Sequence, residues 1–484
     1  MRNMNPNEKR KDLGITAKKD EDFGEWFSQV LKKADLIEYT DVSGCYVLKP
    51  TLYHMWEEVQ SFLDKKFKKI GVKNAYFPLF IPEHLLTKEQ EHVKGFVPEV
   101  AWVTHSGETE LPERLAIRPT SETIMYDAYS KWIQSYRDLP LRINQWCNVV
   151  RWEFKHPIPL LRSREFLWQE GHTVFATKKE ADKEVRQILD IYEQCYNEMM
   201  AVPGTQGRKT DKEKFAGADY TTTFEVFTSN GKVAQACTSH HLGQNFAKSF
   251  NITYLDKDGQ SKHPFQNSWG FTTRSLGVAL TMHSDDKGLV MPPKIAPIKG
   301  VIVPILFEDS RDNVMAVALR VEKMLSKYDI FLDDSERTPG FKFNEWELKG
   351  IPIRIEIGPK DVEKQHVVLA RRDTGAKEFV LLTDLEKRFP VLLDTIQKDM
   401  YEKALKFQKD SIIEVDCWDN FLKAAKEKKV VRAPFCGEEI CEDNIKNEAD
   451  GIKSSCIPFD QPDVERACVK CGKPGKLTHF AKSY

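Results

Sequence analysis

The sequence lacks the marks of secreted and membrane proteins. Its strongest apolar run, residues 300–307, has the length of a strand, whereas about 18 apolar residues are needed to cross a bilayer. Residues 1–22 are polar and charged, without the apolar core that a signal peptide requires. We therefore expect neither a membrane segment nor a secretion signal.

Cysteine is also scarce, with 10 in 484 residues. Cys45, Cys147, Cys195 and Cys237 are scattered along the chain, and Cys195 falls on the apolar side of a predicted helix. A disulfide-stabilised scaffold is instead short and dense in cysteine. The pattern indicates a reducing compartment, and we expect a cytoplasmic protein.

Neither sign of charge is in excess. The chain has 72 Lys and Arg against 73 Asp and Glu, for a net charge of −1. Global charge therefore does not indicate a nucleic-acid partner, and any contact with RNA must come from local clusters of Lys and Arg. With 41% hydrophobic and 30% charged residues, the composition is typical of globular domains.

Hydrophobic periodicity predicts helices and short strands in residues 23–295. Apolar residues recur at three-four spacing in the predicted helices 25–34, 51–70 and 180–200. Strand-like stretches include residues 75–81 and 221–228, and short strands alternate with Pro and Gly over 115–175. Many short strands beside helices favour an α+β domain built on an antiparallel sheet.

The pattern changes after the proline-rich residues 291–297, which we interpret as a linker. Strands are predicted at 300–307, 328–333, 351–357 and 366–370, with a helix at 313–327, and this alternation indicates a small parallel α/β domain. A long helix at about 391–409 leads into the last segment. We therefore predict a flexible lead-in at 1–22 and domains at 23–295, 296–405 and 406–484.

Four cysteines of the last segment are paired in sequence, Cys436 with Cys441 and Cys468 with Cys471. Both pairs lie among Pro and Gly residues, and tight turns that present two sulfurs to one point suit tetrahedral Zn(II). Four protein ligands leave no open coordination position, so we predict a structural zinc site. Reduced thiols without metal and disulfides are the alternatives, with Cys456 as the spare cysteine.

A charged segment near the middle of the chain suits nucleotide chemistry. Arg151 and Glu153 would face the same side of a strand, and a proline-bearing loop would lead to a second strand with Arg162 and Phe166. Such residues offer cations to a polyphosphate, a carboxylate to an amine or hydroxyl, and an aromatic face to a base. An ordinary β-hairpin with a surface ion pair explains the pattern equally well.

A second segment, residues 266–280, is rich in glycine and carries Arg274 where an apolar, helix-like run begins. Glycines let the backbone approach a ligand, although a Gly-rich helix entry explains the segment as well. Together the two segments resemble motifs 2 and 3 of class II aminoacyl-tRNA synthetases. The helix 51–70, followed by Gly71 and Pro78, resembles motif 1, which forms the dimer interface in that class.

Two further sequences narrow the resemblance to prolyl-tRNA synthetases. They are Arg-Pro-Thr-Ser-Glu-Thr at 118–123 and Thr-Ser-His-His-Leu-Gly-Gln at 238–244. The domain order and a cysteine-containing tail that ends in Tyr484 are similar to the archaeal and eukaryotic type. The resemblance extends from about residue 15 to the end of the chain.

The resemblance implies a fold, a reaction and partners. The fold would be a class II α+β catalytic domain on an antiparallel sheet, an α/β anticodon-binding domain and a small zinc-containing α+β C-terminal domain. L-proline and ATP would form prolyl-adenylate and pyrophosphate, and proline would then pass to the 3′ end of tRNA(Pro). The protein would be a homodimer through the motif 1 region. Residues 172–266 are too short for the large editing domain of many bacterial members, so we expect no hydrolytic correction in cis.

The resemblance also implies the roles of individual residues. Arg151 and Arg274 would be catalytic, with Arg151 between the proline carboxylate and the α-phosphate, and Arg162, Arg274 and Mg²⁺ on the outer phosphates. The implied ATP-binding residues are Arg151, Glu153, Arg162, Phe166, Gln235, Thr238, Thr272 and Arg274. The implied proline-binding residues are Thr120, Glu122, Arg151, Trp168, His172 and His240.

Some of these assignments have alternatives. Glu122 also fits a carboxylate at a helix N-terminus, and His172 and His240 also fit hydrogen bonding within the core. His240 and His241 would point to opposite faces of a strand, so we do not expect them to share a metal. Because one methylene gives only about 10–200-fold selectivity, we predict activation of alanine or cysteine.

Other functions remain as alternatives. A synthetase for threonine, serine or glycine is one, although a threonine enzyme would hold zinc in its catalytic domain and no such site is apparent at 118–280. A catalytically silent relative that binds tRNA is another, although it would not need all three arginines. Candidates for tRNA contact in the anticodon domain, which a solvated face would also explain, are Lys360, Arg371, Arg372 and Lys377.

Overall fold

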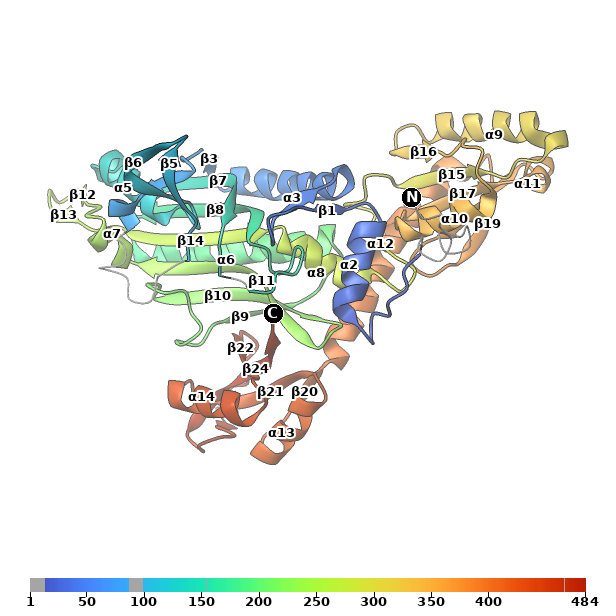
Figure 1. Ribbon diagram of the computed structural model, residues 1–484. Helices are drawn as coiled ribbons and strands as arrows, with labels where there is room; N and C mark the ends of the chain where they lie inside the picture. The colour runs from blue at the N-terminus through green and yellow to red at the C-terminus, as the bar shows by residue number, and fades with distance from the viewer. Residues whose placement is uncertain (1–13, 87–98, 154, 465) are drawn as a thin grey trace.

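The computed structural model describes residues 14–86, 99–153, 155–464 and 466–484 (Figure 1). Its largest feature is a 12-stranded sheet of order β20-β21-β24-β22-β9-β10-β11-β14-β8-β7-β3, in which β23 pairs with β24. Seven of these strands belong to the first predicted domain: β3 (Lys73–Asn74), β7 (Leu141–Val150), β8 (Glu165–Phe175), β9 (Thr205–Arg208), β10 (Tyr220–Thr228), β11 (Lys232–Gly243) and β14 (Phe265–Thr272). Residues 1–13 of the predicted lead-in lie outside the described residues.

The first-domain part of the sheet is antiparallel, as predicted. Each neighbouring pair from β7 to β9 runs antiparallel, and β3 at the edge is parallel to β7. Thr221–Thr228, expected as a strand, falls within β10. Because side chains alternate along a strand, this register determines which residues share a face.

One face of these strands packs against α3 (Pro50–Lys69), α6 (Lys178–Gln194) and α8 (Arg274–His283). Phe67 of α3 contacts Trp269 of β14, with ring centroids 4.9 Å apart. Pro50 suits the first helical position, and Gly71, with φ of +83°, follows the end of the helix. The predicted helices 51–70 and 180–200 are confirmed, the second continuing from α6 into a π-helical turn at Cys195–Met199.

The opposite face is covered at one end by α5 (Glu122–Trp132) and α7 (Asn245–Ser249). Tyr126 and Tyr129 of α5 form a buried cluster with Val174 of β8 and Phe246 of α7. The same face of the sheet holds the cavity described below.

Smaller elements surround this sheet. The predicted helix 25–34 is confirmed by α2 (Phe23–Lys33), which Asp22 caps. The predicted strand 75–81 is wrong for most of its length, because Pro78 lacks the N–H that a sheet ladder needs and strand structure begins only at Phe80. The remaining strands form small sheets: β1 (Ile37–Tyr39) with β2 (Tyr46–Leu48), β4 (Phe80–Pro82) and β5 (Trp102–Ser106) on either side of β6 (Thr109–Ile117), and β12 (Tyr254–Leu255) with β13 (Ser261–Lys262).

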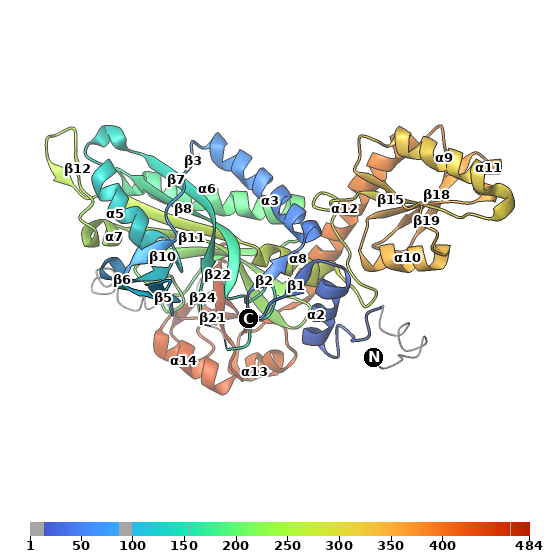
Figure 2. The same cartoon turned by 45° about the horizontal axis from the view of Figure 1, so that its top comes forward.

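A second body, with a five-stranded sheet, lies beside the first (Figure 2). The sheet is mixed rather than parallel as predicted, because β18 runs antiparallel to both β17 and β19. Only the short helix α11 connects β17 to β18, whereas a parallel crossover needs about a dozen residues or more. The elements are β15 (Gly300–Pro304), α9 (Arg311–Met324), β16 (Ile330–Leu332), α10 (Pro339–Leu348), β17 (Ile353–Ile357), α11 (Pro359–Glu363), β18 (His366–Arg371) and β19 (Lys377–Leu381).

Helix α12 (Leu385–Asp410) leads from this body to the C-terminal segment. The predicted start at 391 is wrong, because the helix includes Pro390, whose missing N–H removes only one backbone hydrogen bond. Residue 405, the predicted domain boundary, lies inside the helix. None of the helices in the described part of the chain could span a membrane.

The C-terminal segment extends the large sheet. Strand β22 pairs with β9, and β24 pairs with β11, with Lys482 opposite Lys232. Its elements are β20 (Ile412–Glu414), α13 (Trp418–Lys426), β21 (Val430–Phe435), α14 (Glu439–Glu448), β22 (Lys453–Pro458), β23 (Arg466–Ala467) and β24 (Pro474–Ser483). The strands that carry the cavity and the C-terminal strands therefore share one hydrogen-bonded sheet.

Candidate active site

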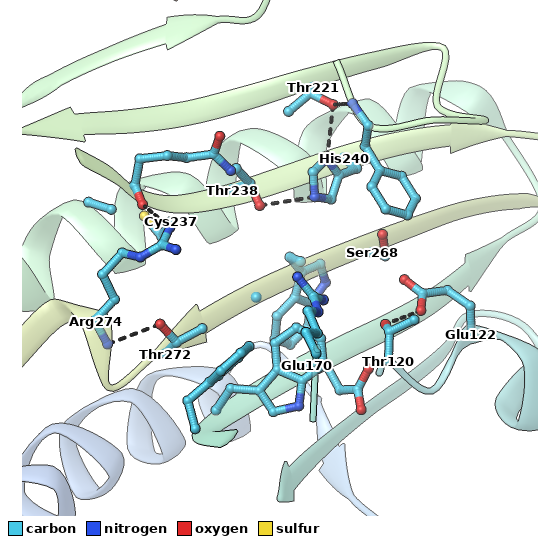
Figure 3. Close-up of a pocket in the computed structure, with 18 of the residues that line it drawn as sticks. Thr120, Glu122, Glu170, Thr221, Cys237, Thr238, His240, Ser268, Thr272 and Arg274 are labelled. Carbon is cyan, nitrogen blue, oxygen red and sulfur yellow. Dashed lines mark hydrogen bonds between the residues drawn. The ribbon is translucent and has the colours of Figure 1, made fainter. Parts of the chain in front are cut away.

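A cavity opens on the face of the large sheet opposite α6 (Figure 3). Every residue predicted to bind ATP or proline lines it, apart from Glu153 and Arg162. The predicted residues in its wall are Thr120, Glu122, Arg151, Phe166, Trp168, His172, Gln235, Thr238, His240, Thr272 and Arg274. The fold thus brings together positions that are up to 154 residues apart in sequence, from 120 to 274.

Alternation along β8 brings together four side chains in the cavity wall. Phe166, Trp168, Glu170 and His172 occupy every second position and point to the same face. Gln169 faces the other way and is bonded to the hydroxyl of Tyr192 in α6. The floor of the cavity therefore has aromatic side chains at one end of β8 and ionisable ones at the other.

The antiparallel register adds residues from the neighbouring strands. In β14, Ser268 lies opposite His172, and in β11, His240 lies opposite Ser268. Thr221 of β10 pairs in turn with His240. One row across the sheet thus supplies polar groups beside the ionisable end of β8.

The arginines gather at the aromatic end. Arg274 begins α8, and its side chain donates to the carbonyl oxygens of Leu161 (3.0 Å) and Gln235 (3.3 Å). Burial lowers the pKa of Arg274, and the positive charges of Arg151 and Arg162 add to this effect. Arg151 and Arg162 are therefore close enough to repel the guanidinium of Arg274, which favours a polyanionic ligand beside it.

Arg151 links the two ends of the cavity. Its Nε donates to the carbonyl oxygen of Pro119 at 3.0 Å, beside the ionisable end. Its guanidinium lies over the rings of Phe166 and Trp168, 5.7 and 5.3 Å from their centroids. Arg151 can therefore reach both a ligand on the aromatic residues and one beside Thr120.

The loop after β7 differs from the prediction. Arg151 and Glu153 were expected on a strand, but β7 ends at Val150, so the two-residue alternation does not apply to them. Glu153 is exposed and lies outside the cavity wall. Arg162 precedes β8 rather than lying in it. A plain surface hairpin is nevertheless excluded for Arg151, because this residue lines the cavity.

Thr120 and Glu122 are buried, with exposed fractions of 4% each. The Thr120 hydroxyl donates to the Glu122 carboxylate. Glu122 is also the first residue of α5. Its two interpretations from sequence, a helix N-terminal carboxylate and a ligand contact, are therefore compatible.

The two predicted histidines have their ring nitrogens engaged by protein groups. His240 lies between the hydroxyls of Thr238 and Thr221, each 2.9 Å from a ring nitrogen. Burial lowers the pKa of His240 to about 3, with a further contribution from His172. His240 is therefore neutral at neutral pH, and it presents its ring rather than a charge to the cavity.

Glu170 also lines the cavity, although its sequence context predicted no role for it. Glu170 is 2% exposed. A carboxylate oxygen of Glu170, one of Glu122 and a ring nitrogen of His172 all lie within 4.8 Å of one another. The signal was present in the alternation of β8, since positions 166, 168 and 172 were already assigned. The hydrogen-bond partners of Glu170 could not be predicted from the sequence.

The four paired cysteines meet at one point, between the start of α14 and the turn that joins β23 to β24. Their sulfur atoms all lie within 4.8 Å of one another, and the sulfurs of Cys436 and Cys471 are 3.7 Å apart. Four thiolates around Zn(II) at about 2.3 Å place neighbouring sulfurs about 3.8 Å apart. The spacing therefore fits the predicted ion. All ten cysteines are free thiols, which does not support disulfides, and Cys456 lies outside the cluster.

Three of the four candidate tRNA contacts are engaged within the protein. Arg371 pairs with Asp373 and Asp399, each at 2.7 Å. Arg372 binds Asp285 through two nitrogens, at 2.9 and 2.7 Å. Lys377 is also paired, with Glu356 at 2.8 Å, and Lys360 is exposed. Arg371, Arg372 and Lys377 therefore have carboxylate partners that a tRNA contact would have to displace.

Three family models match the chain. Residues 104–283 match the class II tRNA synthetase core domain for G, H, P, S and T. Residues 299–391 match an anticodon binding domain, and residues 418–484 match the C-terminal domain of prolyl-tRNA synthetase. Together they cover the cavity, the five-stranded sheet and the cysteine cluster.

Relatives match over nearly the whole chain. The cytoplasmic proline–tRNA ligase of Arabidopsis thaliana is 49% identical, over 98% of this chain and 91% of its own length. The proline–tRNA ligase of Oceanobacillus iheyensis is 49% identical over 97% and 98%. In the bifunctional glutamate/proline–tRNA ligase of Drosophila melanogaster, at 48% identity, the match spans 29% of that protein. The crystal structure of Cryptosporidium parvum prolyl-tRNA synthetase with halofuginone and AMPPNP superposes with a TM-score of 0.95 at 46% identity, covering 98% of this chain and all of that one.

Proposed function

The chain belongs to the prolyl-tRNA synthetase family of class II aminoacyl-tRNA synthetases, and we propose that its cavity binds ATP and L-proline end to end along β8. The reaction is that of a proline–tRNA ligase. ATP activates L-proline as prolyl-adenylate with release of pyrophosphate, and the 3′ end of tRNA(Pro) then accepts the prolyl group.

The observation that carries this placement is the chemical difference between the two ends of the cavity. At one end, Phe166 and Arg274 offer an aromatic face and a cation, which suit a base and a polyphosphate. At the other, Thr120 and Glu122 offer buried oxygen atoms, which suit an ammonium group. Arg151 lies between them, within reach of both.

In the first step, a carboxylate oxygen of proline attacks the α-phosphorus of ATP and pyrophosphate leaves in line. Such chemistry needs positioning and neutralisation of charge more than a protein nucleophile. Arg151 stabilises the negative charge that develops between carboxylate and α-phosphate. Arg162 and Arg274 hold the outer phosphates together with Mg²⁺, which enters with ATP as part of the substrate.

The base and the remaining nucleotide contacts follow from the same placement. Phe166 stacks on the adenine, and the further polar contacts to nucleotide and metal come from Gln235, Thr238 and Thr272. Glu153 is assigned to the adenine amino group. Because Glu153 is exposed outside the cavity wall, its loop would have to turn inward when ATP binds.

The secondary ammonium of proline has two N–H donors to satisfy. Thr120 and Glu122 supply the acceptors, and the carboxylate of Glu122 also neutralises the charge. Trp168, His172 and His240 enclose the pyrrolidine ring, and the neutral state of His240 suits contact with an apolar ring.

The cysteine cluster would hold a structural Zn²⁺ through Cys436, Cys441, Cys468 and Cys471. Their sulfur spacing supports this assignment. With four protein ligands the ion would join α14 to the β23–β24 turn and take no part in catalysis.

The remaining partners are proposed from surfaces and relatives. A homodimer would form through the region of α3 and the strands before it, where Tyr39, Val47 and Tyr53 are 43%, 50% and 44% exposed. The body at residues 300–381 would bind the anticodon of tRNA(Pro). Because the Arabidopsis relative is named as cytoplasmic, we propose a cytoplasmic location.

The test is proline-dependent exchange of labelled pyrophosphate into ATP. The parent protein should support exchange with proline and not with threonine, serine or glycine. Glu122→Gln should raise the KM for proline, and Arg274→Ala should raise the KM for ATP. Exchange that needs no proline, or a Glu122→Gln variant with an unchanged KM for proline, would contradict the proposed placement.

A further inference from the structure

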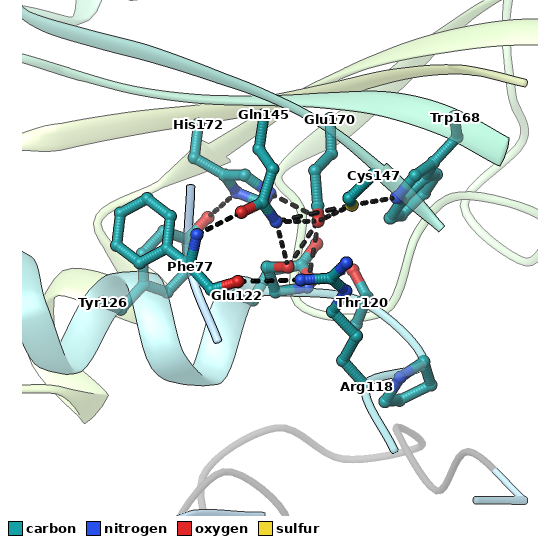
Figure 4. Close-up of polar contacts among 12 residues, drawn as sticks. Phe77, Arg118, Thr120, Glu122, Tyr126, Gln145, Cys147, Trp168, Glu170 and His172 are labelled. Carbon is teal, nitrogen blue, oxygen red and sulfur yellow. Dashed lines mark hydrogen bonds and ion pairs between the residues drawn. The ribbon is translucent and has the colours of Figure 1, made fainter. Parts of the chain in front are cut away.

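The carboxylate of Glu170 is surrounded by hydrogen-bonding groups of the protein (Figure 4). Its Oε2 accepts from the backbone N–H of Ser121 at 3.0 Å and lies 3.1 Å from Nε2 of His172. Its Oε1 accepts from the Ser121 hydroxyl, from Gln145 Nε2 at 3.2 Å and from the Cys147 thiol at 3.6 Å.

The donors are themselves fixed. The Gln145 side-chain oxygen accepts from the backbone N–H of Phe77, so its NH₂ group is directed to Glu170. Nδ1 of His172 is 3.0 Å from the Tyr126 hydroxyl, which leaves Nε2 toward the carboxylate. Burial, and after it the charge of Glu170, raise the pKa of Cys147 to about 12, so the thiol keeps its proton.

Glu170 itself is ionised at neutral pH. Burial alone would raise its pKa, but the hydrogen bond and charge of His172 and the two bonds from Ser121 outweigh burial and lower it. An ionised carboxylate offers about four lone-pair sites, and the five contacts described above already use them. A substrate ammonium would therefore have to displace a protein donor to bind Glu170.

The segment that Glu170 holds is the one that faces the substrate. Ser121 lies between Thr120 and Glu122, whose oxygens line the cavity. The same segment is held at its start by Arg118, which donates to the carbonyl oxygens of Phe77 (2.8 Å) and Asn148 (2.9 Å). Ser121 is thus the point at which the segment is tied to the cavity floor.

We propose that Glu170 is a positioning residue for amino-acid recognition, which acts through Ser121 and does not bind the substrate. By holding the backbone and hydroxyl of Ser121, it sets the places of the Thr120 hydroxyl and the Glu122 carboxylate. This inference rests on the proposed function, in which those two groups accept from the ammonium of proline.

The proposal explains why a carboxylate stands at this position rather than an amide. Glutamine has nearly the same shape, but its NH₂ group is a donor. In place of Oε1 or Oε2 it would face the N–H of Ser121, the NH₂ of Gln145 or Nε2 of His172. Glu170→Gln should therefore displace Ser121 although it changes almost no volume.

The experiment is pyrophosphate exchange at varied proline and varied ATP, with Glu170→Gln, Ser121→Ala and the double variant. Loss of the charged acceptor should raise the KM for proline about 10- to 100-fold, and loss of one hydroxyl bond about 2- to 10-fold. The KM for ATP should not change. Because both variants act on one contact, the double variant should be less impaired than the product of the two single effects.

The matched control is Glu184→Gln. Glu184 is a carboxylate of equal burial, 2% exposed, which accepts from Thr173 and Asn267 on the opposite face of the same strands. Its variant should leave the KM for proline unchanged. If Glu170→Gln does not fold, Ser121→Ala alone decides, since an unchanged KM for proline in that variant overturns the proposal.

Other outcomes separate this inference from the proposed function. Effects of Glu170→Gln and Ser121→Ala that multiply would mean that Glu170 binds the substrate directly. An equal rise in the KM for ATP would mean a general disturbance of the fold. If Glu122→Gln impairs proline binding and Glu170→Gln does not, the inference alone fails. If Glu122→Gln has no effect, the proposed function fails.

Discussion

The ion pair between Asp285 and Arg372 connects the two bodies of the structure and gives a quantitative prediction. Two nitrogens of Arg372 donate to the carboxylate, and its Nε donates to the carbonyl oxygen of Glu347 at 2.7 Å. The Asp285 carbonyl oxygen also accepts from the indole of Trp26 at 3.1 Å. Asp285 lies two residues after the end of α8, and α8 begins at Arg274 in the cavity.

The magnitude follows from the burial of the two partners. The Arg372 side chain is 5% exposed and that of Asp285 is 45% exposed. Breaking a buried pair costs about 3–5 kcal/mol, whereas exposed pairs contribute about 0–1 kcal/mol. Asp285→Asn should therefore destabilise the junction by about 1–3 kcal/mol, between these limits. Asp286→Asn is the control, because the Asp286 carboxylate accepts from the backbone N–H of Lys19 instead.

The sign of the pH dependence is fixed by the lowered pKa of Asp285. Burial would raise this pKa, but the hydrogen bonds and charge of Arg372 outweigh burial. The stabilisation is therefore present above the unfolded pKa of about 3.9 and is lost as the pH falls through the lower folded value. The difference between Asp285→Asn and the parent should vanish in acid.

Hydrogen exchange followed by mass spectrometry measures the effect locally. Asp285→Asn should speed exchange in α10 and in residues 284–291, and leave β10 as in the parent. Charging of tRNA at subsaturating concentrations should fall, while pyrophosphate exchange, which needs no tRNA, should persist. Unchanged protection at neutral pH, or equal loss in Asp286→Asn, would refute the reasoning.

Four further predictions concern the cavity and the cysteine cluster. Arg274→Ala should lower kcat/KM for pyrophosphate exchange about 100- to 1,000-fold, the usual effect of removing one group that stabilises transition-state charge; a loss below tenfold would contradict its role. Alanine or cysteine at saturating concentration should support exchange above background. The side chain of proline has no polar group that the pocket could bind selectively, so discrimination against similar amino acids is weak. Cys468→Ser should lose zinc by elemental analysis and lower the thermal midpoint, whereas Cys456→Ser should keep the metal. His240 should show the nitrogen chemical shifts of a neutral ring by NMR from pH 5 to 8. Its folded pKa of about 3 lies below the unfolded pKa of about 6.5. Protonation of the unfolded state should therefore lower the stability of the protein as the pH falls below about 6.5.

The periodic parts of the fold were predictable from sequence. The helices α2, α3 and α6 carry apolar stripes, and Gly71 marks one end. In the second body strand direction was not predictable, because burial patterns report which residues are buried and not which way a strand runs. The antiparallel pairing of β17 with β18 was therefore missed. The pairing of β22 with β9 was not predictable either, because about 250 residues separate the two strands in the sequence.

The residues of the candidate site also divide into those that were predictable from the sequence and those that were not. Residues in motif-like sequences, such as Arg151 and Arg274, were identified because a charge and a glycine or aromatic neighbour stand close in the sequence. Glu153 was placed by strand alternation beyond the end of β7, and that placement failed.

Glu170 stands two residues from Trp168 and His172, which were assigned from sequence, but its role depends on Ser121, 49 residues earlier. The backbone N–H of Ser121 is a donor that no sequence pattern marks. Groups that face a ligand can thus be recognised by residue type and spacing. Groups that hold them in place are defined by contacts across the sheet. The charge of Glu170 acts in this second way, because it fixes Ser121 and through it the affinity of the pocket for proline.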